Sequence, residues 1–163
     1  MCALIFAPTG TLRHHQVKMI SPSVVLSLHN GTTWFLVGLI WVVQLVHYPM
    51  FDGLDSTTFR QSHAFHSRRI LWIVAPAMLS EFCLAGSLLF ERGLSDWPAA
   101  AGFGLVLFIW VVTAFIMVPI HQRLEHSGFR PEIHRGLVRW NWLRTLAWSA
   151  RGAICLVWLQ TGR

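Results

Sequence analysis

Charged residues are scarce in this chain. Only 12% of its 163 residues are Asp, Glu, Lys or Arg, whereas a soluble domain of this length would carry roughly twice that share. There is a single tyrosine against nine tryptophans, and 54% of the residues are hydrophobic. This composition excludes an ordinary soluble domain, and we expect an integral membrane protein.

Cysteine is also scarce. The three cysteines include no C-x-x-C pair, and Cys83 and Cys155 fall within apolar stretches. A thiol in such a stretch behaves as a small apolar side chain. The pattern therefore supports neither a disulfide framework nor a thiolate metal site.

The N-terminal residues have no signal-peptide pattern. Residues 1–18 lack a basic stretch followed by an apolar core, and a second methionine, Met19, stands just before the first apolar stretch. We expect residues 1–21 to be a disordered extension or a segment upstream of the true start. Because no internal repeat or low-complexity linker is present, residues 22–163 are expected to form one domain.

Four apolar windows follow. They cover residues 24–46, 70–90, 99–118 and 137–160. Each is close to the roughly 20 residues with which a helix crosses the hydrocarbon core of a membrane. Because their backbones must be satisfied internally and their connections are short, we expect an all-α, antiparallel four-helix bundle in the membrane.

The basic residues lie at the edges of these windows. Seven are in or beside the first and third connections, namely Arg60, Arg68, Arg69, Arg123, Arg130, Arg135 and Arg139, whereas Arg13, Lys18, Arg92 and Arg163 lie on the other side. The positive-inside rule then places both termini outside the cytoplasm, with a bacterial inner membrane as the expected location. No basic stripe with interleaved aromatic residues indicates nucleic-acid binding.

Polar residues within the windows recur at helical spacing. One stripe contains Phe59, His63, His66, Ile70, Ala77 and Glu81, and the other contains Asn141, Arg144, Trp148, Arg151 and Cys155. Glu81 and Arg151 lie at matching depths, each roughly 16–18 Å from the basic boundary at 1.5 Å per residue. We therefore predict an ion pair between them near the middle of the membrane. Its whole role could equally be to fix the register of the helices.

Several histidines gather near the basic boundary. His63 and His66 are spaced i, i+3, and His47 and His121 end neighbouring windows. Such a group could ligate a transition metal or haem, and the alternative is a set of hydrogen-bonded interfacial rings. His29 and Asn30 lie at the opposite end of the first window, and we expect them to cap a helix or to form an interface contact.

Several tryptophans near the window boundaries fit an interfacial belt, whereas Trp110 and Trp148 lie deeper. Facing inward together with Tyr48, they would provide walls for a planar hydrophobic substrate. The expected partners are therefore membrane lipid and a hydrophobic small molecule. The glycines Gly38, Gly86, Gly102 and Gly104 would allow close helix contacts within one chain or in a homo-oligomer.

The last window contains the run from Trp140 to Arg151, with Asn141, Arg144 and Thr145, and the third ends in Val118-Pro119 followed by Leu124. These segments resemble a small four-span family of domains of unknown function that includes the anthrone oxygenases of polyketide pathways. The resemblance implies a membrane-embedded oxygenase that adds O₂ to an electron-rich aromatic carbon without a classical cofactor motif.

A site of this kind can be assigned to particular residues. Asn141 and Arg144 would hold a phenolate or enolate oxygen, since fixed donors stabilise developing charge in a dry cavity. His121 or His47 would remove the proton.

Two other function classes remain open. The run from His29 to Trp41 loosely resembles the first span of membrane protoporphyrinogen oxidases and copper-resistance membrane proteins, and implies a haem-, porphyrin- or metal-binding protein. A non-catalytic membrane subunit instead predicts a dry, fully paired polar stripe with no ligand-sized cavity.

Overall fold

The computed structural model describes residues 21–52 and 54–160, and they form an all-α fold of four long helical rods. The first rod is α1 (Pro22–Val42), which continues into a π-helical turn (Val43–His47) and a 3₁₀ turn (Pro49–Phe51), and the second is α2 (Ser56–Arg92). The third comprises α3 (Trp97–Val112), a second π-helical turn (Thr113–Met117) and α4 (Val118–Ser127), and the fourth is α5 (Pro131–Gln160). The expected extension, residues 1–21, lies outside the described residues apart from Ser21.

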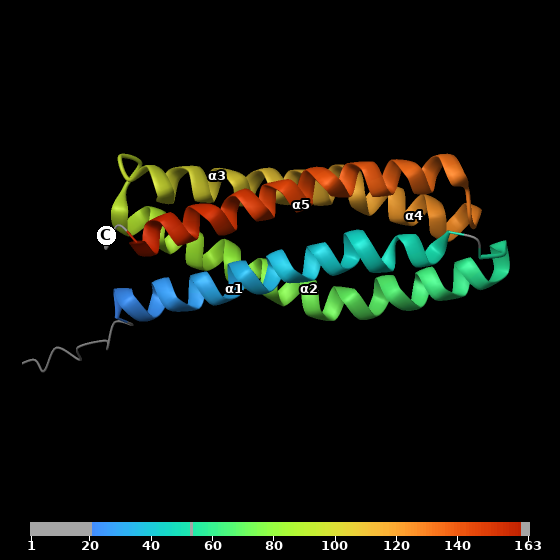
Figure 1. The fold of residues 1–163 in the computed structure, drawn as a ribbon, viewed down its shortest axis with the longest axis horizontal. Helices are drawn as coiled ribbons and strands as arrows, with labels where there is room; N and C mark the ends of the chain where they lie inside the picture. The colour runs from blue at the N-terminus through green and yellow to red at the C-terminus, as the bar shows by residue number, and fades with distance from the viewer. Residues whose placement is uncertain (1–20, 53, 161–163) are drawn as a thin grey trace, which may run out of the picture.

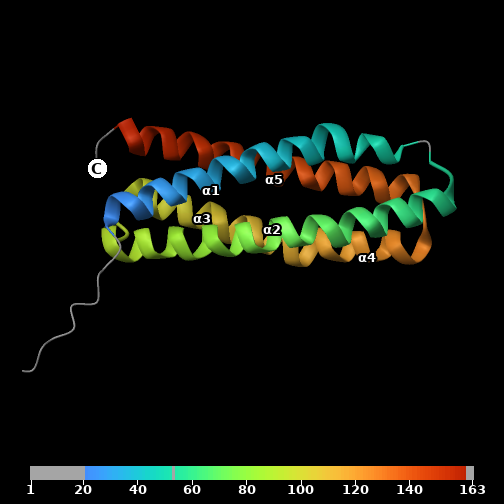
Figure 2. The same cartoon turned by 90° about the horizontal axis from the view of Figure 1, so that it is seen from below.

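The rods lie side by side, and consecutive rods run in opposite directions (Figures 1 and 2). Helix α1 packs against α2 and α5, α3 packs against the same two helices, and α4 contacts α2 and α5. The α1–α2 and α4–α5 connections therefore meet at one end, where Arg60, Arg123, Arg130 and Arg135 are exposed. We call this the basic end, and the opposite end, with the start of α1 and the finish of α5, the terminal end.

The helices are longer than the apolar windows predicted from the sequence. Helix α2 has 37 residues, about 55 Å at 1.5 Å per residue, whereas a membrane core is about 30 Å thick. It begins at Ser56, well before the apolar window at 70–90, and remains α-helical through Pro76. The surplus length lies toward the basic end, so the rods continue past their apolar parts.

Local signals set the helix ends. Asp55 caps α2 by accepting hydrogen bonds from the backbone N–H groups of Thr57 and Thr58. Hydrogen bonds from Thr58, its hydroxyl first, hold the pKa of Asp55 below its ordinary value of 3.8. Gly93 and Gly128 end α2 and α4 with φ of 80° and 72°, a left-handed conformation that suits glycine.

A π-helical turn interrupts both the first and the third rod. Each is followed closely by a proline, Pro49 or Pro119. Proline cannot donate the usual helical hydrogen bond and clashes with the preceding turn, so the wider turn relieves the conflict. One extra residue rotates the following side chains by about 100° relative to a continuous α-helix, and this rotation directs Tyr48 and His121.

The distribution of side chains is inverted relative to a soluble protein. Glu81 and Arg151 are 0% and 1% exposed, whereas Trp72, Phe90 and Phe115 are 81%, 94% and 76% exposed. Among the described residues, three helical segments are long and apolar enough to cross a membrane: Ser23–Phe51, Ser56–Arg92 and Trp97–Ser127. Helix α5 is not one of them, since its arginines lower its hydropathy.

Candidate functional site

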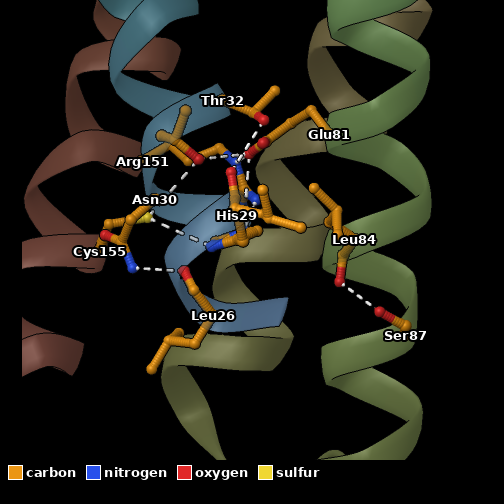
Figure 3. Close-up of polar contacts among 11 residues, drawn as sticks. Leu26, His29, Asn30, Thr32, Glu81, Leu84, Ser87, Arg151 and Cys155 are labelled. Carbon is orange, nitrogen blue, oxygen red and sulfur yellow. Dashed lines mark hydrogen bonds and ion pairs between the residues drawn. The ribbon is translucent and has the colours of Figure 1, made fainter. Parts of the chain in front are cut away.

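Five buried polar side chains from three helices meet between the middle of the rods and the terminal end. They are His29 and Thr33 of α1, Glu81 of α2, and Arg151 and Cys155 of α5, and we call them the ion-pair cluster. Figure 3 shows His29, Glu81, Arg151 and Cys155 pointing toward one another. The cluster thus ties three of the four rods together.

Arg151 is the centre of this cluster. Its Nε donates to Glu81 Oε1 at 2.5 Å, and its Nη2 donates to His29 Nε2 at 2.5 Å. The hydroxyl of Thr33 donates to the same Glu81 oxygen at 2.6 Å. The ion pair predicted from the sequence is therefore present as a direct contact, with a histidine and a threonine bound to it.

The hydrogen bonds fix the protonation of His29. Because Nε2 accepts from Arg151, the neutral ring carries its proton on Nδ1, which lies 3.9 Å from Cys155 Sγ. His29 Nε2 is also 3.7 Å from Glu81 Oε1, but a nitrogen without a proton makes no ion pair there. The Cys155 thiol donates to Thr33 at 3.7 Å and is therefore uncharged. The charged members of the cluster are Arg151 and Glu81, which form the ion pair.

The third rod leaves room for this arrangement at Gly102 of α3. A Cβ at this position would lie 2.8 Å from Arg151 Nη1, whereas a Cβ at Gly104 would meet nothing within 4 Å. The close approach of α3 favours glycine at position 102, because Glu81 and His29 hold the guanidinium in place. All four rods thus meet at Arg151.

The expectation for His29 and Asn30 is wrong in one respect. Neither residue caps a helix, because α1 begins at Pro22, about two turns earlier. Both side chains are buried, and Asn30 donates to the Leu26 carbonyl one turn back. Sequence analysis missed His29 as a partner of Arg151, although His29 and Thr33 at i, i+4 share one helical face.

A second group of polar side chains lies toward the basic end. It contains His47, Tyr48, His63, His66 and His121, and we call it the histidine cluster. His63 Nε2 lies 3.0 Å from His121 Nδ1, and the Tyr48 hydroxyl lies 3.4 Å from His121 Nε2. The rings of His47 and His66 form a separate pair with centroids 4.5 Å apart.

The contact between His63 and His121 constrains their protons. Only one of the two facing nitrogens can carry a hydrogen, so both rings cannot be fully protonated at once. If Tyr48 donates to His121 Nε2, then His121 Nδ1 donates to His63 Nε2. Tyr48, His121 and His63 therefore form a continuous line of hydrogen-bonding groups that a proton can follow.

A cavity of about 240 Å³ adjoins this line. Its apolar walls include Leu36, Ile40, Val74, Met78 and Met117, and its polar lining includes Tyr48, His66, His121, Glu125 and Arg144. Because a cavity of about 150 Å³ can already hold benzene, this one has room for more than a single aromatic ring. Apolar walls with a few convergent polar groups are typical of ligand sites.

Arg144 contributes an uncompensated positive charge to the cavity. It is 8% exposed, its Nη1 donates to Asn141 Oδ1 at 3.1 Å, and its Nε has no hydrogen-bond partner among the described residues. Asn141 in turn donates to Gln44 Oε1 at 2.7 Å. Glu125 lines the same cavity but is not ion-paired with Arg144. A buried guanidinium without a carboxylate partner is costly and attracts an anionic group.

Some of the other predicted site residues line the cavity and some do not. Tyr48 and Trp148 line the cavity together with His121 and Arg144. Trp110 is not part of the lining and packs against Phe82, with ring centroids 6.1 Å apart. His47 and Asn141 also lie behind the lining, where His47 contacts His66 and Asn141 positions Arg144.

The rings of His63 and His66, predicted as metal ligands, have different partners. His63 contacts His121, whereas His66 contacts His47. Over residues 21–52 and 54–160, no three His, Cys, Asp or Glu side chains are arranged to hold a metal ion. The arrangement instead offers proton transfer and the binding of an anionic oxygen.

Two further residues near the basic end were missed by the sequence analysis. His134 of α5 is buried, and its Nδ1 lies 3.1 Å from Oδ1 of Asp52, which is 67% exposed. Both residues fall outside the apolar windows, and so no helical stripe indicated them. The only signal was the position of both in connections expected on the basic side.

Searches with this chain find no match among protein-family models, curated proteins or solved structures.

Proposed function

We propose that this chain is an integral membrane oxidoreductase of the oxygenase type, which acts on a planar, hydrophobic substrate in the cavity between its rods. The observation that carries the proposal is the buried Arg144, which has no carboxylate partner and lines a mostly apolar cavity together with His121. A non-catalytic subunit with a dry, fully paired polar stripe would have no use for such a cavity.

The membrane location rests on the inverted distribution of side chains. Helix α5 is proposed as the fourth span, although its composition is less apolar than that of the other rods. A hydropathy average counts Arg144 and Arg151 as polar wherever they point. Both are buried against neighbouring helices, as charged residues within membrane spans usually are. The exposed arginines at the basic end favour a cytoplasmic location for that end, with both termini outside, in a bacterial inner membrane.

The proposed reaction begins with proton removal. A substrate CH₂ group that is conjugated to a ketone through aromatic rings loses a proton to His121, directly or through the Tyr48 hydroxyl. The resulting enolate or phenolate oxygen lies against Arg144, which Asn141 holds in place. Positive charge fixed in a dry cavity favours this anion most strongly as it forms.

The anion then supplies electrons to O₂, which is the co-reactant of the proposal. A carbon–oxygen bond forms and gives a peroxide anion, which takes up a proton to become a hydroperoxide. The hydroperoxide then loses water to leave a new carbonyl group. The net change is CH₂ + O₂ → C=O + H₂O, in which the substrate is oxidised and O₂ is reduced. The mostly apolar lining limits the water that competes for the anion.

The test uses anthrone as substrate and purified protein in detergent, with O₂ consumption and quinone absorbance measured above the uncatalysed background. We expect the Arg144→Leu variant to lose turnover and to remain folded by gel filtration and circular dichroism. Arg139→Leu is the matched control, because Arg139 lies on the same helix but is exposed. Equal turnover in the two variants would refute the role of Arg144, and no wild-type turnover above background would refute the oxygenase reaction.

A further inference from the structure

His134 and Asp52 have no part in the site described so far, although they connect buried protein with solvent. His134 is 2% exposed, whereas Asp52, 3.1 Å from its Nδ1, is 67% exposed. Because the carboxylate accepts, His134 carries a proton on Nδ1. The pair thus provides a contact through which a proton can leave the interior.

His134 and His63, which belongs to the histidine cluster, each have a ring nitrogen without a partner. Nε2 of His134 and Nδ1 of His63 are both buried and have no hydrogen-bond partner among the described residues. Two phenylalanine rings link their surroundings. Phe129 contacts His134 with centroids 5.5 Å apart and Phe59 at 5.1 Å, and Phe59 stacks on His63 at 5.2 Å.

Two unpaired ring nitrogens in one buried region are unfavourable. Each has lost its contact with water and has gained no hydrogen bond in return. A water molecule that reaches both nitrogens would satisfy them together, since one nitrogen donates and the other accepts. Buried waters commonly occupy polar sites of this kind.

We propose that His121, His63, a bridging water, His134 and Asp52 form a proton path from the cavity to the surface of the basic end. Its first link is the 3.0 Å contact between His121 and His63, and its last link is the 3.1 Å contact between His134 and Asp52. Only the turnover role of the path rests on the proposed function, because the path itself needs no substrate.

The movement of protons balances over one cycle. Each ring accepts a proton on one nitrogen and releases one from the other, so passage of one proton outward reverses every tautomer. When the peroxide anion takes up a proton to become the hydroperoxide, passage of one proton inward restores the original tautomers. One proton therefore leaves to solvent after the substrate is deprotonated, and one returns from solvent later in the cycle. The cycle releases no net proton.

The test measures exchange of ring N–H hydrogens with water by NMR, on protein labelled with ¹⁵N-histidine in detergent micelles. The His63 signal is identified by its loss in His63→Asn. We expect rapid exchange at His63 although this side chain is fully buried, and exchange about tenfold slower in His134→Gln. Glutamine can keep hydrogen bonds to Asp52 and to a water, but it cannot accept and release a proton as imidazole does.

The matched control is His126→Gln, which changes an exposed histidine of α4 and should leave exchange at His63 unchanged. Asp52→Asn leaves His134 in place and should slow exchange about threefold, because water can partly replace the exposed carboxylate. Unchanged exchange in both His134→Gln and Asp52→Asn would overturn the path, as would slow exchange at His63 in the wild-type protein. Loss of turnover in Arg144→Leu tests the proposed function separately, so the two proposals can fail independently.

Discussion

Arg151 of α5 and Glu81 of α2 lie 70 residues apart in the chain and form a direct ion pair, with Nε 2.5 Å from Oε1. Neither side chain reaches solvent. Loss of one partner would leave the other charge buried and unpaired, so we expect Glu81→Ala or Arg151→Ala to destabilise the protein by roughly 3–5 kcal/mol. The double variant should lose less than the sum of the two single variants, as measured by unfolding in detergent.

The control for this prediction is Glu91→Ala, which removes an exposed carboxylate from the same helix. Its effect on the free energy of unfolding should be close to zero. If Glu81→Ala unfolds at the same denaturant concentration as Glu91→Ala, the ion pair contributes no stability.

Two glycines of α3 provide a sharper test of the same region. Gly102→Ala places a Cβ 2.8 Å from Arg151 Nη1, and the guanidinium cannot readily move away because Glu81 and His29 hold it. We expect a loss of about 1–3 kcal/mol. Gly104→Ala meets no atom within 4 Å and should gain about 0.5–1 kcal/mol from reduced chain entropy. If the unfolding midpoints of Gly102→Ala and Gly104→Ala shifted in the same direction, the close contact between Gly102 and Arg151 would be contradicted.

A larger side chain on the face of α1 that lines the cavity should prevent a ligand from binding there. Leu39 lines the cavity, whereas Leu45, in the π-helical turn that follows α1, is 58% exposed and faces outward. We expect Leu39→Trp to fill the cavity and abolish binding of a planar phenol such as 2-naphthol, and Leu45→Trp to leave binding intact. Isothermal titration calorimetry in detergent measures both. Equal affinities for the two variants would show that the phenol binds elsewhere.

The cap at Asp55 makes a small part of the stability dependent on pH. Its folded pKa lies below the ordinary value of 3.8, so its contribution is present above that value and is lost as the pH falls through the folded pKa. We expect Asp55→Asn to lower stability near neutral pH and to reduce the loss of stability below pH 3.8. Thermal melts across this range measure the difference, and parallel pH profiles for variant and wild type would exclude the contribution.

The all-α class and the interior stripe of α5 followed from composition and spacing, whereas the predicted stripe of α2 is fully buried only at Phe59, His63 and Glu81. The stripe from Asn141 to Cys155 is buried at each of its members, because a period near 3.6 identifies one helical face without any tertiary information. Equal depth identified Glu81 and Arg151 as partners. The depth of Glu81 and Arg151 in the membrane can be calculated from the sequence because each residue of a regular helix adds a fixed rise.

Other features depend on information that helical periodicity does not carry. The partnership of His29 was missed because this residue, about two turns from the start of α1, was expected to form an end contact, whereas its side chain is buried. The cavity arises from space that side chains leave unfilled, which no residue pattern records. The two π-helical turns were also missed, although Pro49 and Pro119 give a local reason for both.

These two turns make part of the fold adjustable. Each holds one residue more than an ordinary turn. The first lies close to the end of its rod, so loss of a single codon there would rotate only the few residues up to Phe51. The second precedes the 10 residues of α4, so the same loss there would rotate the whole of α4. Tyr48 or His121 would then be replaced at the cavity by a neighbour, while the part of each rod before the turn stayed as it is. The fold could in this way acquire new ligand preferences through indels as well as through point substitutions.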